Sequence, residues 1–250
     1  MQRKKICLAT LFVFITSLCQ AGKVDLSLTG GAAFSRPSNN TTLQLNQFVT
    51  SLYVNDEKNQ AGFFAGIGIG HTFEQIYHKP LNLSLNLMLY DVSFGHVTGT
   101  EQPFVSGGDF DTLEYKFRVR SYPLMIMPRL IFTSFSWQPF IFGGLGVSWN
   151  RAYDYQEKPT DSSLGAAPAT VPFNDKTIAA FAYQVGLGIQ HQIYQNIKQH
   201  ITLDVAMDYH YMNLGTGQLG TIPAETTDDH LKVPRLSAQA LAISLNASLG

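Results

Sequence analysis

The stretch "FAYQVGLGIQ", residues 181–190, decides the fold class because large apolar residues alternate in it with small or polar ones. An alternation with a period of two is typical of a β-strand that has one apolar face. That face contacts either a protein core or lipid, and the rest of the chain has to decide between them. The apolar positions are Phe181, Tyr183, Val185, Leu187 and Ile189, and the positions between them are Ala182, Gln184, Gly186, Gly188 and Gln190.

The same alternation recurs along the whole chain and predicts eight strands in all. In "LNLSLNLMLY" every second residue is leucine, and "ITLDVAMDYHY" sets Ile201, Leu203, Val205 and Met207 against Thr202, Asp204, Ala206 and Asp208. The other alternating segments are 24–34, 62–73, 115–127, 137–149 and 238–249.

The composition favours lipid as the contact of the apolar face. Charged residues make up only 14% of the 250 residues, against about a quarter in ordinary soluble domains. A soluble lipocalin-like barrel also alternates, but its outward polar face should be rich in Lys and Glu. Here that face is mostly Gly, Ser, Thr, Asn and Ala, which fit a narrow, filled lumen. Closure into a barrel leaves no unpaired backbone edge in hydrocarbon.

The connections between the expected strands alternate between long and short. They cover approximately residues 35–60, 75–80, 96–113, 133–136, 156–177, 192–199 and 215–235. All long connections therefore fall at one end, as in outer-membrane barrels with short periplasmic turns and long external loops. The sequence thus predicts an all-β protein, an eight-stranded antiparallel transmembrane up-and-down β-barrel with four long extracellular loops.

Aromatic residues are placed as two membrane interfaces would require. Trp137 and Trp149 share one strand face 12 positions apart, which corresponds to roughly 30 Å along a tilted barrel axis. Interfacial indoles are typical of both membrane surfaces. If the turn is centred on Asn196, Tyr183 and Tyr209 should lie at one height beside Phe181 and Tyr211.

Residues 1–21 have the features of a secretory signal peptide, which leaves 22–250 as the barrel. Arg3, Lys4 and Lys5 precede an uncharged run, and Cys19-Gln20-Ala21 places small residues before a cut after Ala21. A single membrane anchor is an alternative, although the run is shorter than the roughly 20 residues that a spanning helix needs. A lipoprotein cut before Cys19 is another, but Leu18 stands where a small residue is expected.

Cleavage after Ala21 would change the chemistry available to the chain. Both cysteines, Cys7 and Cys19, would leave, so neither disulfides nor thiolate metal sites are expected. With three of the 17 cations removed, 14 Lys plus Arg remain against 18 Asp plus Glu, a formal charge of −4. That balance excludes a nucleic-acid partner.

Three segments carry a resemblance to a known family. "QPFIFGGLGVSWN", "FAYQVGLGIQHQI" and "LDVAMDYHYMNLG" resemble the Pro-aromatic glycine strand, the Ala-Tyr-Gln-x-Gly-x-Gly strand and the Tyr-x-Tyr-x-x-x-Gly strand end of the opacity-protein-like, eight-stranded outer-membrane barrels of Gram-negative bacteria. The resemblance covers essentially the mature chain and is strongest from Tyr115 onward. Family members usually finish on an aromatic residue, whereas this chain ends Ala247-Ser248-Leu249-Gly250.

The resemblance implies a role at the outer membrane and no catalysis. We expect a structural or surface-interaction, adhesion-like role, with a small-solute porin-like channel as the alternative. The implied partners are outer-membrane lipid and lipopolysaccharide, and host-cell surfaces or other envelope components. No cofactor, metal or catalytic residue is expected.

One group of residues has the composition of a chemical site. Asp204, Asp208 and His210 lie on the inward side of one strand and could act as an acid/base pair or hold a cation. The alternative is an internal charge network with a second strand, because buried charges must be paired. We predict the network, with Arg118 and Arg120 as the main cations. The second strand carries Glu114, Lys116, Arg118 and Arg120 between Tyr115, Phe117 and Val119.

A lipid A-modifying hydrolase is a further alternative because such enzymes occur among eight-stranded barrels. They place a His and a Ser two positions apart on a lipid-facing strand, but the candidates here, His210 with Met212 and His96 with Thr98, lack the serine. His71 and His191 are expected at the lower interface.

Glycine-rich inward faces favour a channel because they leave space in the lumen, whereas Phe140 and Phe142 would fill it. These glycines are Gly66, Gly68, Gly70, Gly144, Gly146, Gly186 and Gly188. The long loop around residues 156–177 is the surface most suited to contact a partner.

Overall fold

A computed structural model describes residues 22–36, 40–44, 50–56, 58–74, 80–103, 112–160, 173–222 and 230–250. The expected signal peptide lies outside these residues and stays a prediction. Every regular element in the described part of the chain is a β-strand. No helix there is long and apolar enough to cross a membrane.

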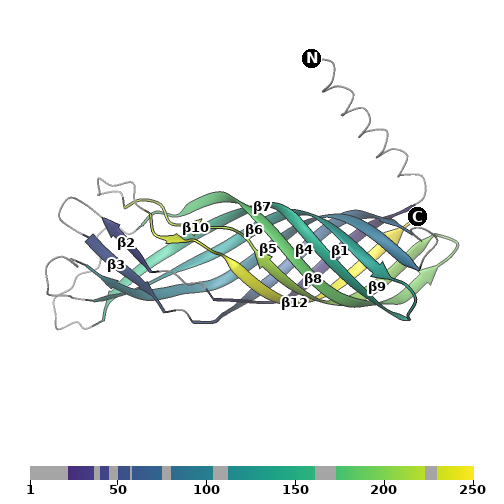
Figure 1. Cartoon of the computed structure of the whole chain (residues 1–250), viewed down its shortest axis with the longest axis horizontal. Coiled ribbons are helices and arrows are strands. Elements are labelled where there is room, and N and C mark those ends of the chain that lie inside the picture. The colour runs from purple at the N-terminus through teal and green to yellow at the C-terminus, as the bar shows by residue number, and fades with distance from the viewer. Residues whose placement is uncertain are drawn as a thin grey trace, which may run out of the picture.

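Eight antiparallel strands form a closed ring, which confirms the predicted barrel (Figure 1). Each strand pairs with the next one round the ring, and β12 closes it against β1 from Val24↔Leu249 to Ser35↔Ala238. The ring strands are β1 (Gly22–Ser35), β4 (Gln60–Phe73), β5 (Leu81–Gln102), β6 (Leu113–Phe132), β7 (Trp137–Pro159), β8 (Lys176–Asn196), β9 (Ile201–Asn213) and β12 (Ser237–Leu249).

The long and short connections lie at opposite ends of the barrel, which we name the loop end and the turn end (Figure 1). At the turn end, residues 133–136 join β6 to β7, and residues 197–200 join β8 to β9. The loop end is partly structured by β2 (Thr41–Gln44), β3 (Thr50–Asn55), β10 (Gly217–Gln218) and β11 (Lys232–Val233). Strand β3 pairs with β5 from Leu52↔Gln102 to Asn55↔Gly99, so the first long connection extends the barrel wall.

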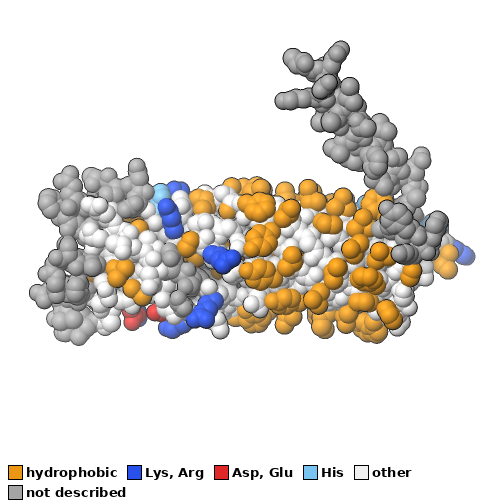
Figure 2. All heavy atoms as spheres, in the orientation of Figure 1, with side chains coloured by type: hydrophobic (Ala, Val, Ile, Leu, Met, Phe, Trp, Pro, Cys, Tyr) orange, Lys and Arg blue, Asp and Glu red, His pale blue; other side chains and the backbone are white. Residues whose placement is uncertain are grey.

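The outward face of the barrel carries an apolar band. Leu187, Ile126 and Ile243 are 60%, 58% and 62% exposed, and large apolar residues of other strands continue the band around the visible face (Figure 2). Trp137 and Trp149 both lie on this outward face of β7. The opening stretch behaves as predicted, with Phe181, Val185, Leu187 and Ile189 outside and Ala182, Gln184 and Gln190 buried inside.

Strands β5 to β7 continue past the apolar band and, with β2 and β3, form what we name the outer extension. It comprises β2, β3 and residues 97–102, 113–120 and 151–159. In the outer extension the inward face is apolar and the outward face is charged, whereas in the apolar band the outward face is apolar. Tyr115, Phe117 and Val119 of β6 are buried inside, and the charged residues Lys116 and Arg118 between them are exposed. Tyr53, Tyr155 and Phe173 complete this second core, with Tyr155 and Phe173 packed edge to face at 4.9 Å.

The register between β8 and β9 differs from the one predicted. Tyr183 pairs with Asn213, and Tyr209 pairs with Leu187, so the two tyrosines do not lie at one height. The hairpin closes through residues 197–200, and a β-bulge between Gln192 and Tyr194 adds one residue to β8. The pairing is therefore centred near Lys198 rather than on Asn196, and the prediction was wrong by four positions on one strand.

Candidate functional site

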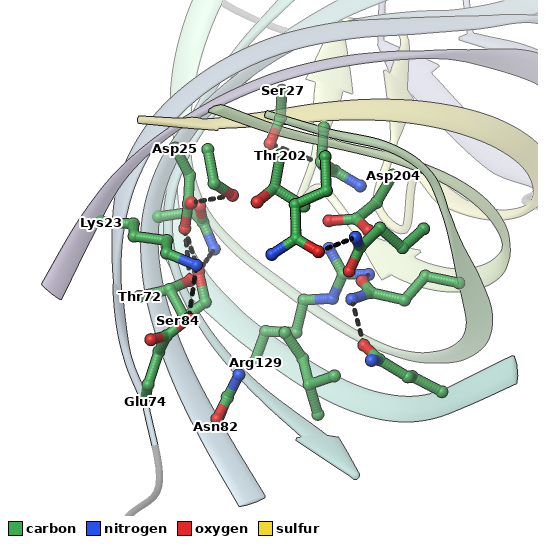
Figure 3. Close-up of a pocket in the computed structure, with 18 residues that line it drawn as sticks. Lys23, Asp25, Ser27, Thr72, Glu74, Asn82, Ser84, Arg129, Thr202 and Asp204 are labelled. Carbon is green, nitrogen blue, oxygen red and sulfur yellow. Dashed lines mark hydrogen bonds and ion pairs between the residues drawn. The ribbon is translucent and has the colours of Figure 1, made fainter. Parts of the chain in front are cut away.

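A polar cavity of about 210 Å³ occupies the lumen at the turn end (Figure 3). We name it the vestibule. Its lining comes from inward positions of strands all round the ring, most of which carry Ser, Thr, Asn, Gln or Asp. Residues of the lining that carry charge are Lys23, Asp25, Glu74, Arg129 and Asp204.

Asp25 joins four strands at one side of the vestibule. Its carboxylate accepts hydrogen bonds from Ser248 Oγ at 2.7 Å, from Ser84 Oγ at 3.1 Å and from Thr72 Oγ1. Because these hydroxyls come from β12, β5 and β4, one buried charge on β1 fixes the register of its neighbours. Buried carboxylates require this degree of hydrogen bonding to offset their desolvation.

Arg129 is the buried cation of the lumen, and the sequence analysis did not identify it. Its side chain is 8% exposed, donates from Nη2 to Gln190 Oε1 at 2.5 Å, and stacks over Phe140 at 3.5 Å from the ring centroid. The carboxylates of Asp204 and Asp208 act on it electrostatically. The signal available in the sequence was the alternation along β6, because Arg129 belongs to the same set of odd-numbered positions as Met125 and Met127, which face inward.

Asp208 and His210 form the predicted inward cluster together, while Asp204 lines the vestibule. His210 Nε2 lies 2.6 Å from Asp208 Oδ2, and Ser244 Oγ donates to Asp208 Oδ1 at 2.9 Å. The imidazole packs against Phe64 at 4.9 Å and Phe142 at 4.8 Å between ring centroids. We name this layer the plug.

The cation assignment of the predicted charge network was wrong. Arg120 lies outside the barrel, where Nε donates to Asp91 Oδ1 at 2.7 Å and Nη2 donates to Oδ2. Arg118 is also outside, with Nε 3.1 Å from His96 Nε2 and 3.4 Å from Asp154 Oδ2. The physical reason is that inward positions of β6 are odd-numbered throughout, so the even-numbered arginines face water beyond the apolar band.

Large side chains occupy the space that the inward glycines leave. A Cβ on Gly186 would lie 2.1 Å from the Phe142 ring, and one on Gly66 would lie 2.3 Å from the Tyr90 ring. The void beside the plug measures about 30 Å³, which holds about one or two water molecules. The prediction that Phe140 and Phe142 fill the lumen is confirmed, because both are buried.

The arrangement of Ser244, Asp208 and His210 does not activate a nucleophile. In a hydrolytic triad the histidine accepts the serine proton and the carboxylate orients the histidine. Here the serine donates to the carboxylate, so the histidine has no contact with the hydroxyl. His71 packs edge to face against Phe73, and His191 stacks on Trp137 at 4.8 Å, both at the turn end as expected. Among the described residues, no group of three His, Cys, Asp or Glu residues could hold a metal ion.

A buried acid marks the core of the outer extension. Glu101 is 4% exposed, and burial together with the nearby carboxylate of Glu157 raises its pKa to about 8. Tyr155 donates from its hydroxyl to Glu157 Oε1 at 2.5 Å. Glu101 therefore holds a proton at neutral pH, and its carboxyl group is tolerated between Tyr53 and Ser51 inside an aromatic core.

The molecule thus combines a closed strand ring, an apolar band outside and a polar, charge-bearing interior behind that band. This combination is the reverse of a soluble barrel and fits a hydrocarbon surround. The chain is an eight-stranded barrel of the outer-membrane type.

Comparisons with known proteins give the following similarities. No family model matches the chain, and no curated protein matches it. Among solved structures, Neisserial surface protein A (NspA) is similar at 10% identity and a TM-score of 0.45, over 91% of this chain and 98% of that one. The outer membrane protein OprG from Pseudomonas aeruginosa is similar at 14% identity and a TM-score of 0.36, over 90% of this chain and 96% of that one. Ail of Yersinia pestis, in complex with the heparin analogue sucrose octasulfate, is similar at 14% identity and a TM-score of 0.35, over 90% of this chain and 99% of that one.

Proposed function

We propose that this chain is an integral outer-membrane barrel with a structural and surface-interaction role, and that it acts through its loop end. The observation that carries the proposal is the outer extension, a second core built past the apolar band. A barrel needs no such extension to close its wall or to span a membrane. Its charged exterior and the long connections that it supports suit contact with other molecules.

The plug supports a non-conducting and non-enzymatic role. Asp208 bonds to both His210 and Ser244, and the rings of Phe64, Phe142 and Tyr90 pack against His210, so the vestibule ends at this layer. The small-solute channel is a second candidate because the vestibule holds a polar cavity. Single-channel conductance of the purified barrel in a planar bilayer separates the two, since the proposal predicts no stable open steps.

The proposal includes cleavage after Ala21 and an orientation with the loop end outside. Both chain ends of a barrel with an even number of strands lie on one side, and assembly from the periplasm favours short turns there. An epitope inserted after Gly165 should be stained on intact cells, and the same epitope at Asn196 should require permeabilised cells. The opposite pattern would invert the orientation and remove the proposed contact surface.

Host-cell binding tests the interaction role directly. Deletion of residues 161–172 should reduce attachment of expressing cells to a host-cell layer while the barrel keeps its heat-modifiable mobility. A matched control is an alanine substitution of Asn196 at the turn end, which should leave attachment unchanged. Attachment that is equal with and without the loop would leave a purely structural role.

A further inference from the structure

The vestibule keeps one cation and one anion apart. Of the five charged residues that line it, Lys23 and Glu74 form an ion pair at 2.7 Å, and Asp25 accepts hydrogen bonds from three hydroxyl groups. Arg129 and Asp204 remain, and neither forms an ion pair within the described part of the chain. A buried charge is costly unless a charged or polar group bonds to it. The cavity between these two side chains is therefore the place to look for a partner.

Arg129 uses only part of its hydrogen-bonding capacity. A guanidinium has five N–H groups. Its Nη2 donates to Gln190 Oε1 at 2.5 Å, and the guanidinium lies 3.5 Å from the centre of the Phe140 ring, so two neighbours hold it in place. Its Nε is buried and has no hydrogen-bond partner in the described structure. Figure 3 shows this side chain pointing into the cavity.

A second donor without a partner lies across the lumen. Asn246 of β12 is 7% exposed; its Oδ1 accepts a hydrogen bond from Ser27 Oγ at 2.8 Å, but its Nδ2 is buried with no partner among the described residues. Strands β6 and β12 are four places apart round the ring in either direction, so Arg129 and Asn246 line the vestibule from opposite walls. A ligand with acceptor oxygens between these walls would satisfy both donors.

Asp204 has a carboxylate that no neighbouring side chain bonds to. On β9 it is in register with Asn246 of β12 and with Gln192 of β8. Gln192 donates instead to Gln195 at 3.1 Å, and Asn246 Nδ2 donates to no described residue. Arg129 and Lys23 act on Asp204 through space. The carboxylate can therefore accept hydrogen bonds from a donor that enters the cavity.

The size and polarity of the cavity limit what can enter. Its volume of about 210 Å³ corresponds to about seven water molecules at roughly 30 Å³ each. Ile131 is the one apolar residue in the lining that the structure describes, so an apolar molecule gains little there. Because the plug closes the inner end, a molecule that enters from the turn end also leaves by it. The vestibule is thus a blind polar pocket.

We propose that the vestibule binds a small polar zwitterion that carries a carboxylate and an ammonium group. The carboxylate accepts hydrogen bonds from Arg129 Nε and Asn246 Nδ2, and the ammonium donates to Asp204. Hydrogen bonds between charged groups are the stronger ones, and both ends of such a ligand form them. The inference goes beyond the proposed role of the loop end and places a second binding function at the turn end.

A ligand with a single charge would satisfy only part of this site. An anion at Arg129 would bring a second negative charge towards Asp204. A cation at Asp204 would leave the donors of Arg129 and Asn246 unmet, and an unmet buried donor costs about 1–3 kcal/mol. A zwitterion meets both requirements and leaves the net charge of the lumen unchanged.

Isothermal titration calorimetry on the purified, refolded full barrel in detergent tests the proposal with three probes. L-Serine carries both charged groups, acetate carries the carboxylate only, and ethanolamine at neutral pH carries the ammonium only. We expect L-serine to bind at one site per barrel. Its affinity should exceed that of either single-charge probe by at least about tenfold.

Two substitutions assign the two ends of the ligand. Asp204→Asn keeps the size of the side chain and should weaken L-serine binding at least about tenfold. The same change should strengthen acetate binding, because the carboxylate that repels acetate is gone. Asn246→Ala should weaken both probes. Asp91→Asn is the matched control, because it makes the same substitution outside the barrel, where Asp91 pairs with Arg120. Unheated electrophoretic mobility verifies that each variant is folded.

Three results would overturn the proposal. The first is L-serine binding no tighter than acetate binding in the wild type. The second is equal L-serine affinity in the wild type and in Asp204→Asn. The third is no heat of binding with any probe, which would show that the vestibule holds water only. Because the assay reports on the turn end of the purified barrel, its failure leaves the loop-end role standing, and a failed attachment assay leaves the pocket standing.

Discussion

Two halves of the same strands have opposite interiors. Behind the apolar band the lumen contains the charged side chains of Asp25, Arg129 and Asp208 beside buried aromatic rings, whereas the outer extension encloses Tyr115, Phe117 and other apolar side chains around one buried acid. Strand β6 contributes to both halves without a change of parity, since odd-numbered residues face inward from Leu113 to Ile131. Figure 2 shows the same change from outside, where Lys and Arg gather beside the edge of the apolar band.

The difference shows that the surroundings of a barrel decide what its interior can be. In the outer extension water surrounds the wall, and burial of apolar surface stabilises the inner face at roughly 25 cal/mol per Å². In the membrane half, lipid tails accept apolar side chains as readily as a protein core does. Backbone hydrogen bonds between the strands and side-chain hydrogen bonds in the lumen, such as those of Asp25 and Asp208, therefore stabilise that half.

The largest expected effect comes from removing the lumen cation. Arg129→Met removes the buried cation whose charge acts through space on Asp204 and Asp208, together with its hydrogen bond to Gln190, and leaving a buried charge uncompensated costs about 3–5 kcal/mol. Urea unfolding of the refolded barrel in detergent would measure the loss. A free energy of unfolding within 1 kcal/mol of the wild type would show that the lumen charges do not depend on Arg129.

A charge on the outward face tests where the apolar band ends. Ile243→Arg places a cation in lipid and should destabilise the barrel by about 2–4 kcal/mol, whereas near an interface the cost falls to about 0–1 kcal/mol. Gln239→Arg is the matched control, because Gln239 shares the strand and the face but lies four positions nearer to the loop end. Unfolding in lipid vesicles would compare them, and equal losses would contradict the boundary drawn here.

The acid in the outer extension predicts a pH effect confined to that half. The folded-state pKa of Glu101 is raised to about 8, so its contribution to stability is fully present at low pH and is lost as pH rises through 8. From pH 7 to pH 9 the outer extension should lose about 1 kcal/mol. Protease cleavage at the loop end should accelerate over this range in the wild type and not in Glu101→Gln. The same acceleration in both proteins would exclude Glu101 as the cause.

The smallest effect is expected at Arg120. Its ion pair with Asp91 is partly exposed, and such surface pairs contribute about 0–1 kcal/mol. Arg120→Ala should therefore leave urea unfolding nearly unchanged, in contrast to Arg129→Met on the same strand. A loss of several kcal/mol would restore the interior charge network expected from the sequence.

The strand count and the outward face could be predicted from the sequence because each strand repeats a period of two, as in residues 181–190. The point at which the outward face changes from apolar to charged could not be predicted from the alternation. Odd-numbered residues of β6 face inward on both sides of that point, and only the surroundings of the wall differ. In β5 the inward-facing residues change from even-numbered to odd-numbered positions at a bulge between Ser93 and His96, which contains Gly95 at φ 72°. Phe94 and Val97 both face inward as a result. A single glycine does not mark a bulge reliably in sequence.

The candidate site was predicted in part. Asp208 and His210 are paired inside as the alternation implied, but the partner cation was assigned to the wrong half of β6. Arg129 follows a proline, at the end of an apolar segment, where an isolated charge is easily taken for the start of a turn. The vestibule also depends on register across the closing pair β1 and β12, which brings Asp25 to Ser248 and is not encoded locally.

Cysteine labelling along β6 tests the reversal of polarity most directly. Both native cysteines precede Gly22, so single substitutions would provide the only thiols of the cleaved chain. A membrane-impermeant maleimide applied to intact cells should label Lys116→Cys and Arg118→Cys, and should not label Phe117→Cys, Ile126→Cys or Leu130→Cys. Labelling of Ile126→Cys together with protection of Lys116→Cys would contradict the account.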